Sequence, residues 1–237
     1  MSGETELSAE REWFYRQRAN IVVTNLQKKR INAQYSSDRQ VALAAVLAMI
    51  PPEAIVAKGD SISVDQIGII SELKKRNENN IIDPLERGAN GSYVIPEEEG
   101  RLAAAKEAFF SDVFLVGTNA ITLDGKLVNT DGWGNRVAPM IFGPKKVIVV
   151  VGINKIVDNL DQAMERIRQF AAPINAKRHC VTLHLPEYGD LPCVKAGKCV
   201  DCNHELSICH YTVIIDGAAL PEKGRINVVL VGEELGI

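Results

Sequence analysis

The 237-residue sequence has no excess of positive charge, few aromatic residues and no long apolar run. Its 27 Lys and Arg residues against 30 Asp and Glu residues give a net charge of −3, which excludes a basic field for nucleic acid or anionic lipid. The longest apolar run, residues 41–50, is far shorter than the roughly 20 residues of a membrane-spanning helix. The first 20 residues are polar, with no apolar signal segment. We therefore expect a cytoplasmic globular protein that binds neither nucleic acid nor membrane.

Histidine is also scarce, and its distribution excludes a common hydrolase arrangement. The four histidines all fall between residues 179 and 210, so the sequence offers no dispersed Ser-His-Asp set. No pair of carboxylates stands out as an acid–base couple. The residues alone therefore assign no catalytic group and leave open whether the protein is an enzyme.

Cysteine is rare too, but four of the five cysteines are clustered. They are Cys193, Cys199, Cys202 and Cys209. A reducing cytoplasm disfavours disulfides, so clustered thiols indicate metal binding or redox chemistry. A structural zinc site usually has two short Cys-x2–4-Cys pairs and this sequence has one, which favours a 4Fe-4S cluster over zinc. Zinc, and a loop of reduced thiols that binds nothing, remain alternatives.

The remaining pattern alternates helices with short apolar strands. Helical periodicity predicts helices over residues 7–31 and 39–49, which form an N-terminal helical segment, residues 1–50, packed on the core. Continuous apolar strands between amphipathic helices then predict a mostly parallel sheet with helices on both faces. The predicted strands are residues 54–57, 81–82, 113–116, 147–151, 212–215 and 226–231. The core α/β domain is residues 51–237, and residues 186–210 form a cysteine-rich insertion.

Ligands of such sheets bind beyond the carboxyl ends of the strands. The loop after the first apolar strand leads into a helix N-terminus, where hydroxyls and free amides suit an anion. Its candidate ligand-binding residues are Lys58, Gly59, Ser61 and Ser63. The alternative is that Ser63 only caps the helix. We interpret Lys155, in another such loop, as a solvated charge at a helix start.

A second candidate cluster lies in the glycine-rich stretch 117–136. Asp124-Gly125 predicts a hairpin, and a second turn follows it before a short helix over residues 136–142. Backbone amides in such a turn, beside an arginine, can hold a carboxylate or phosphate, although hairpins also use Asn, Asp and Gly for backbone geometry alone. The candidates here are Gly117, Asn119, Asp131, Asn135 and Arg136.

The same residues resemble those of a known family. The stretches 117–136 and 142–155, then Ala172-Pro-Ile-Asn-Ala-Lys177, the four-cysteine loop and the closing residues 228–236 resemble the LUD (lactate utilization) domain. The resemblance covers nearly the whole chain from Trp13 onward. It implies a Rossmann-like fold related to ribose-5-phosphate isomerase and CoA-transferases.

The resemblance also implies a link to the oxidation of L-lactate to pyruvate. The protein would then be a redox or accessory subunit that carries a cysteine-bound metal centre, working with iron–sulfur or oxidoreductase partner subunits, with a homo-oligomer also open. If it is enzymatic, it would be an oxidoreductase component. The chain lacks the ferredoxin-type Cys-x2-Cys-x2-Cys-x3-Cys-Pro run of the large multidomain members. The alternative function is a small-anion or acyl-ligand binding or regulatory protein with a structural zinc site.

Overall fold

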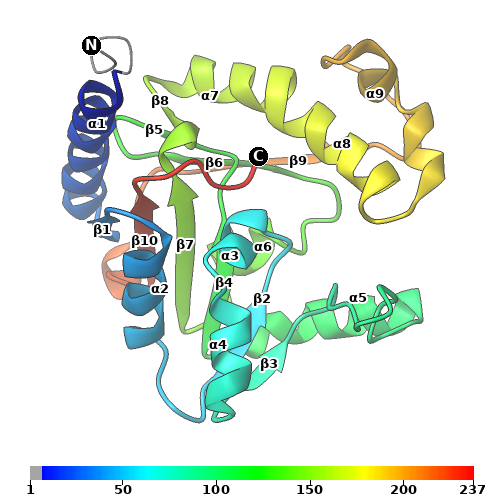
Figure 1. Cartoon of the computed structure of the whole chain (residues 1–237), viewed down its shortest axis with the longest axis horizontal. Helices are drawn as coiled ribbons and strands as arrows, with labels where there is room; N and C mark the ends of the chain where they lie inside the picture. Colours follow the sequence, from blue (N-terminus) through cyan, green and yellow to red (C-terminus); the bar gives the residue numbers. More distant parts are fainter. Residues whose placement is uncertain (1–6) are drawn as a thin grey trace, which may run out of the picture.

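The computed structural model describes residues 7–237, which form an α/β fold around a six-stranded parallel sheet (Figure 1). The strand order is β1-β10-β7-β4-β2-β3, and every neighbouring pair is parallel. The strands are β1 (Asn32–Ser36), β10 (Ile226–Val231), β7 (Lys146–Gly152), β4 (Val113–Gly117), β2 (Ile55–Lys58) and β3 (Asn80–Ile82). This arrangement confirms the predicted Rossmann-like, mostly parallel sheet.

The central strands are continuous apolar runs because both of their faces are covered. Alternate residues of β7 enter different hydrophobic clusters, with Val149 on one face and Ile148 and Val150 on the other. Helices α2 (Arg39–Ala48), α3 (Ile62–Gln66) and α4 (Ile69–Arg76) cover one face. The long helix α1 (Ser8–Lys28) and a second small sheet cover the other.

The second sheet has the order β8-β5-β6-β9 and is built on the predicted hairpin. Its strands are β8 (Ile156–Val157), β5 (Ala120–Thr122), β6 (Leu127–Asp131) and β9 (Tyr211–Ile215). Gly125 has a φ of +82°, a left-handed conformation that glycine adopts readily, and its N–H donates to the Thr122 carbonyl. The Asp-Gly pair therefore turns the chain as predicted.

Three consecutive helical segments run across the top of the molecule in Figure 1, beyond the end of β7. They are α7 (Leu160–Arg166), the π-helical turn η3 (Ile167–Ala171) and α8 (Ala172–Val181), and η4 (Pro186–Asp190) and α9 (Pro192–Ala196) follow them. The remaining helices are α5 (Glu98–Glu107), η1 (Ala108–Phe110), α6 (Val137–Ile141), η2 (Ile153–Lys155) and η5 (Leu220–Glu222). No helix among residues 7–237 has the length and apolar character needed to span a membrane.

The N-terminal segment contributes a strand that the sequence pattern did not predict. The first helix ends at Lys28 rather than near residue 31, and β1 follows it at the edge of the main sheet. The strand sequence Asn-Ala-Gln-Tyr-Ser has no apolar run because four of its five residues are only half-buried or exposed. An edge strand with a solvated face needs no continuous apolar pattern, so periodicity misses it.

Candidate functional site

The carboxyl ends of four parallel strands, β2, β4, β7 and β10, lie on the same side of the main sheet, so the loops that follow them come together. The loop after β2 contacts the loop after β4 so closely that a Cβ built on Gly117 would lie 2.6 Å from Oγ of Ser61. A Cβ on Gly59 would lie 3.0 Å from the Phe114 ring and 3.3 Å from the Arg136 side chain. The glycines thus permit the loops to approach each other closely. We use the name crevice for the group of polar residues at this end of the sheet: Ser63, Asn119, Asn129, Arg136, Lys155 and Arg166.

Lys58, at the end of β2, already has two carboxylate partners. Its buried Nζ lies 3.0 Å from Oδ1 of Asp65 and 3.4 Å from Oδ2 of Asp83. Burial lowers the pKa of Lys58, but the charges of Asp83 and Asp65 outweigh it and hold the pKa above its ordinary value. The charge of Lys58 is therefore balanced within the protein.

The two serines of this loop have different partners. Ser61, not Ser63, is the N-cap of α3, and its Oγ accepts a hydrogen bond from the Val64 N–H at 3.4 Å. The predicted capping role of Ser63 is wrong by two residues because α3 begins at residue 62. Ser63 is 1% exposed, and its Oγ instead lies 3.0 Å from Nζ of Lys155.

Lys155 is a residue whose importance the sequence did not reveal. It ends η2, directly after β7, and only 5% of it is exposed, so the interpretation as a solvated charge is wrong. Burial, followed by the charges of Arg166 and Arg136, lowers the pKa of Lys155 to about 7. Its only hydrogen-bond partner within residues 7–237 is Ser63.

Asn119 and Arg136 form the predicted second cluster together with Asn129. Arg136 donates from Nη1 to Oδ1 of Asn129 at 2.7 Å and from Nη2 to Oδ1 of Asn119 at 3.0 Å. Burial lowers the pKa of Arg136, and the charge of Asp131 offsets part of that effect. Asp131 accepts the backbone N–H groups of Arg136 and Val137, so it fixes the start of α6.

Two polar side chains of this cluster lack partners within the described part of the chain. Nδ2 of Asn129 is fully buried and makes no hydrogen bond there, which leaves an unsatisfied donor beside Arg136. Asn135, in the turn before α6, is half-buried and makes no side-chain hydrogen bond to this network.

Arg166, at the end of α7, is a second residue that sequence reasoning missed. Its Nη1 donates to the Asn119 carbonyl at 2.6 Å and its Nε to the Asn154 carbonyl at 3.2 Å. Burial lowers the pKa of Arg166 to about 10. Within residues 7–237, no Asp or Glu side chain forms an ion pair with Arg166, Arg136 or Lys155. The crevice therefore holds three cations that pair with no Asp or Glu side chain of the described residues, although Nη1 of Arg166 also donates to the Ile237 oxygen at 3.4 Å.

A salt bridge attaches α8 to the loop that follows β2. Arg178 donates from Nη1 and Nη2 to the two carboxylate oxygens of Asp60, both at 2.8 Å. Burial raises the pKa of Asp60, but the hydrogen bond and charge of Arg178 outweigh it and hold the pKa below its ordinary value. This two-point contact fixes the approach of α8 to the loop after β2.

The cysteine segment lies against the crevice. The N–H of His210 donates to the Asp131 carbonyl at 3.0 Å, and that of Cys199 to the Arg168 carbonyl at 3.1 Å. Cys209 and Asn119 line one small hollow between the segment and η3. Burial, followed by the charges of the other three clustered cysteines, Cys193, Cys199 and Cys202, raises the pKa of Cys209 to about 11.

The four thiols therefore gather on one side of the molecule. Within residues 7–237, no three Cys, His, Asp or Glu side chains are arranged closely enough to hold a metal ion. The donor set of four thiols nevertheless suits zinc or a 4Fe-4S cluster in its chemistry.

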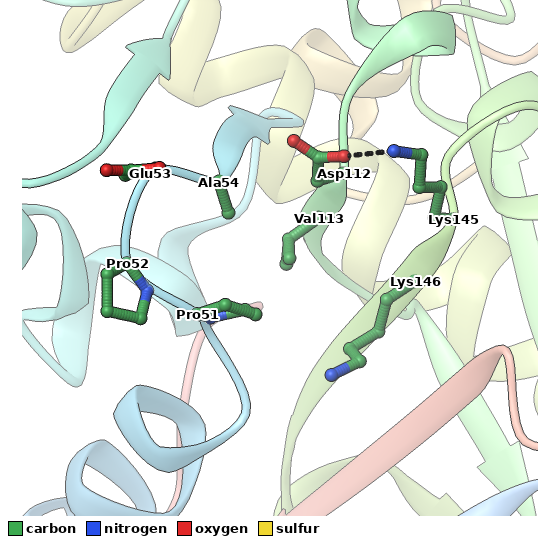
Figure 2. Close-up of a pocket in the computed structure, with 8 residues that line it drawn as sticks. All are labelled: Pro51, Pro52, Glu53, Ala54, Asp112, Val113, Lys145 and Lys146. Atoms are coloured by element: carbon green, nitrogen blue, oxygen red, sulfur yellow. Dashed lines mark hydrogen bonds and ion pairs between the residues drawn. The ribbon is translucent and has the colours of Figure 1, made fainter.

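Another surface hollow lies at the opposite end of the sheet, where the strands begin (Figure 2). Its two lysines have partners inside the protein: Nζ of Lys145 pairs with Asp112 at 2.7 Å, and Nζ of Lys146 donates to the Met49 carbonyl at 2.7 Å. With its cations paired, this hollow has less capacity for an anion than the crevice.

Comparisons with known proteins agree with the resemblance seen in the sequence. The LUD domain family model matches residues 19–231, which include both sheets and the cysteine segment. A solved structure, that of a DUF162 family protein from Deinococcus radiodurans at 1.70 Å resolution, is similar with a TM-score of 0.48 and 11% sequence identity. The similarity covers 93% of this chain and 97% of that chain. No curated protein matches. Because the family model spans most of the sequence, the chain belongs to the LUD domain family.

Proposed function

We propose that this protein binds a small carboxylate in the crevice and acts in the cytoplasmic oxidation of lactate to pyruvate. The observation that carries the proposal is the group of three cations, Lys155, Arg136 and Arg166, none of which pairs with an Asp or Glu side chain within residues 7–237. Lys155 is buried, and Arg136 and Arg166 are half-buried beside it. A buried charge without a paired carboxylate is costly, and an anion bound next to Lys155 would offset that cost. The link to lactate comes from membership of the LUD family.

The unused donors favour a carboxylate of small size. Nη2 of Arg166 has no hydrogen-bond acceptor within the described residues, and neither has Nδ2 of Asn129. Lys155 adds a positive charge whenever it is protonated. A 2-hydroxy or 2-oxo acid offers a carboxylate for the guanidinium and a second oxygen for the amine or amide. Lys58 takes no part in this proposal because Asp65 and Asp83 already balance its charge.

We further propose that the four-cysteine segment holds a metal centre next to the bound acid. The four thiols lie within seventeen residues of sequence, and Cys209 lines the same hollow as the crevice residue Asn119. When bound, a 4Fe-4S cluster would supply one-electron transfer, which suits an oxidoreductase component with iron–sulfur partner subunits. A zinc ion would instead have a structural role and hold the segment in one conformation, which suits an anion-binding or regulatory protein.

Carboxylate binding is tested by calorimetry with L-lactate, pyruvate and inorganic phosphate. Replacing Arg166 removes a charge-assisted hydrogen bond worth about 1.5–3 kcal/mol, so Arg166→Gln should weaken lactate binding roughly tenfold or more. Arg168→Gln is the matched control, because Arg168 is exposed in the adjacent turn η3. Equal affinities for the two variants, or binding of none of the three anions, would contradict the proposal. If phosphate binds and neither lactate nor pyruvate does, the ligand of the crevice is a phosphate and the proposed carboxylate ligand is wrong.

The metal centre is tested by purification without air, followed by metal analysis. A brown protein with iron and sulfide indicates an iron–sulfur cluster, and a colourless protein with zinc indicates the alternative. Cys202→Ser should release the metal and leave the main sheet folded, since the hydrogen bonds from Cys199 and His210 run to Arg168 and Asp131, which lie outside the main sheet. Less than about a tenth of a metal equivalent in the unsubstituted protein would rule out both forms of the site.

A further inference from the structure

The pair formed by Lys155 and Ser63 has a chemistry that simple anion binding does not require. An arginine would bind a carboxylate at this place without losing its charge. The structure instead buries a lysine amine 3.0 Å from a buried hydroxyl, with no carboxylate paired to it in the described chain. Burial and the charges of Arg166 and Arg136 lower the pKa of this amine to about 7. A neutral amine is a nucleophile, whereas an ammonium ion is not.

We propose that Lys155 is a catalytic residue that forms an imine with the keto carbon of a 2-oxo acid such as pyruvate. This inference rests on the proposed function, because it takes the small carboxylate of the crevice as the substrate. The lone pair of Nζ adds to the keto carbon, and the carbonyl oxygen takes up a proton to give a carbinolamine. Loss of that hydroxyl with a proton, as one water, forms the C=N bond. No electrons are gained or lost overall.

Ser63 is placed to move the protons of both steps. Its Oγ is the hydrogen-bond partner of Nζ, so the hydroxyl can take the proton that the amine loses on addition. It can also return a proton to the departing hydroxyl. Arg166 and Arg136 would hold the carboxylate of the acid and keep the amine neutral through their charge.

The chain after β10 covers this pair. Gly236 lies so close that a Cβ built on it would be 2.6 Å from Oγ of Ser63 and 2.8 Å from Nζ of Lys155. Two hydrogen bonds hold the segment there, from the Gly236 N–H to Gln66 at 2.6 Å and from the Leu235 N–H to Asn154 at 3.1 Å. In the view of Figure 1 this C-terminal segment, drawn in red, passes between α3 and the helices α7 and α8. For the acid to reach Nζ, Gly236 must therefore move off the amine.

Reductive trapping tests the imine directly. The full chain is incubated with pyruvate and sodium cyanoborohydride, digested, and mapped by mass spectrometry. We expect one carboxyethyl group on Lys155, none on this residue with L-lactate, which has no carbonyl group, and no such adduct in Lys155→Arg. Lys146→Arg, a substitution at the far end of β7, should leave the trapping unchanged. Ser63→Ala should slow the trapping roughly tenfold, with the adduct still on Lys155.

The outcomes separate this inference from the proposed function. Pyruvate that binds by calorimetry but is never trapped on Lys155, or is trapped equally on exposed lysines, overturns the imine and leaves carboxylate binding intact. Absence of binding and of trapping overturns both. Mapping of the unsubstituted protein decides the matter even if Lys155→Arg fails to fold.

Discussion

Replacing Lys155 with methionine should stabilise the protein and change how its stability depends on pH. The unfolded chain holds a proton on this lysine up to about pH 10.5, whereas burial in the folded chain lowers the pKa to about 7. Between these two values folding releases one proton, so the free energy of unfolding rises with pH by about 1.4 kcal/mol per unit. Below about pH 7 both states hold the proton and the contribution is constant.

The size of the effect follows from the width of that window. A pKa that differs by about 3.5 units between the two states corresponds to a cost on the order of 5 kcal/mol at pH 6. Lys155→Met removes this cost and fills a similar volume, but it leaves Ser63 without its partner, at a loss of about 1–3 kcal/mol. The variant should therefore be more stable than the parent by a few kcal/mol at pH 6.

The assay is urea denaturation between pH 6 and 9, in buffers without phosphate or carboxylates, since either anion would compensate the amine. The advantage of Lys155→Met should shrink as pH rises, because the parent gains stability through the window while the variant lacks this lysine. The charged groups that act on the amine, Arg166 and Arg136, stay protonated throughout this range. A variant less stable than the parent at pH 6, or a constant difference across the range, would refute the reasoning.

Two further predictions concern the pairs around the crevice. Lys58→Met should destabilise the fold by about 3 kcal/mol, measured by chemical denaturation, because it leaves the buried Asp83 without its cation; a loss below about 0.5 kcal/mol would show that the pair is dispensable. Arg178→Lys should lose the two-point contact with Asp60 and increase hydrogen exchange in α8 and the cysteine segment, while protection of β7 stays the same. Unchanged exchange in α8 would mean that this salt bridge does not hold the helix.

Much of the fold could be predicted because the central strands are buried on both faces. The β-branched run at 147–151 and the apolar run at 113–116 lie beside each other as β7 and β4. The Asp-Gly hairpin could be predicted because its sequence signal is local: it requires a residue that adopts the left-handed conformation at one position, and Gly125 does. The edge strand β1 was missed because its residues face solvent and carry no periodic signal.

The candidate site could be predicted only in part, because burial of a charged residue is decided by distant parts of the chain. The loops at 58–63 and 117–119 meet as expected for neighbouring parallel strands. Lys155 looks like an ordinary charge after a strand, but Ser63 and Gly236, from distant parts of the chain, lie against its amine and help to remove it from water. Lys58 looked free in sequence, but Asp83, twenty-five residues away, folds back to pair with it.

The proposals depend on one property of the crevice, the buried amine of Lys155, whose pKa is lowered and whose charge a bound anion would stabilise. The most direct test is an NMR titration of Lys155, followed through its side-chain resonances with and without saturating L-lactate. We expect a pKa near 7 without ligand and a clear rise when lactate binds, because the carboxylate stabilises the ammonium form. An ordinary lysine pKa in the free protein, or a pKa that lactate leaves unchanged, would contradict it.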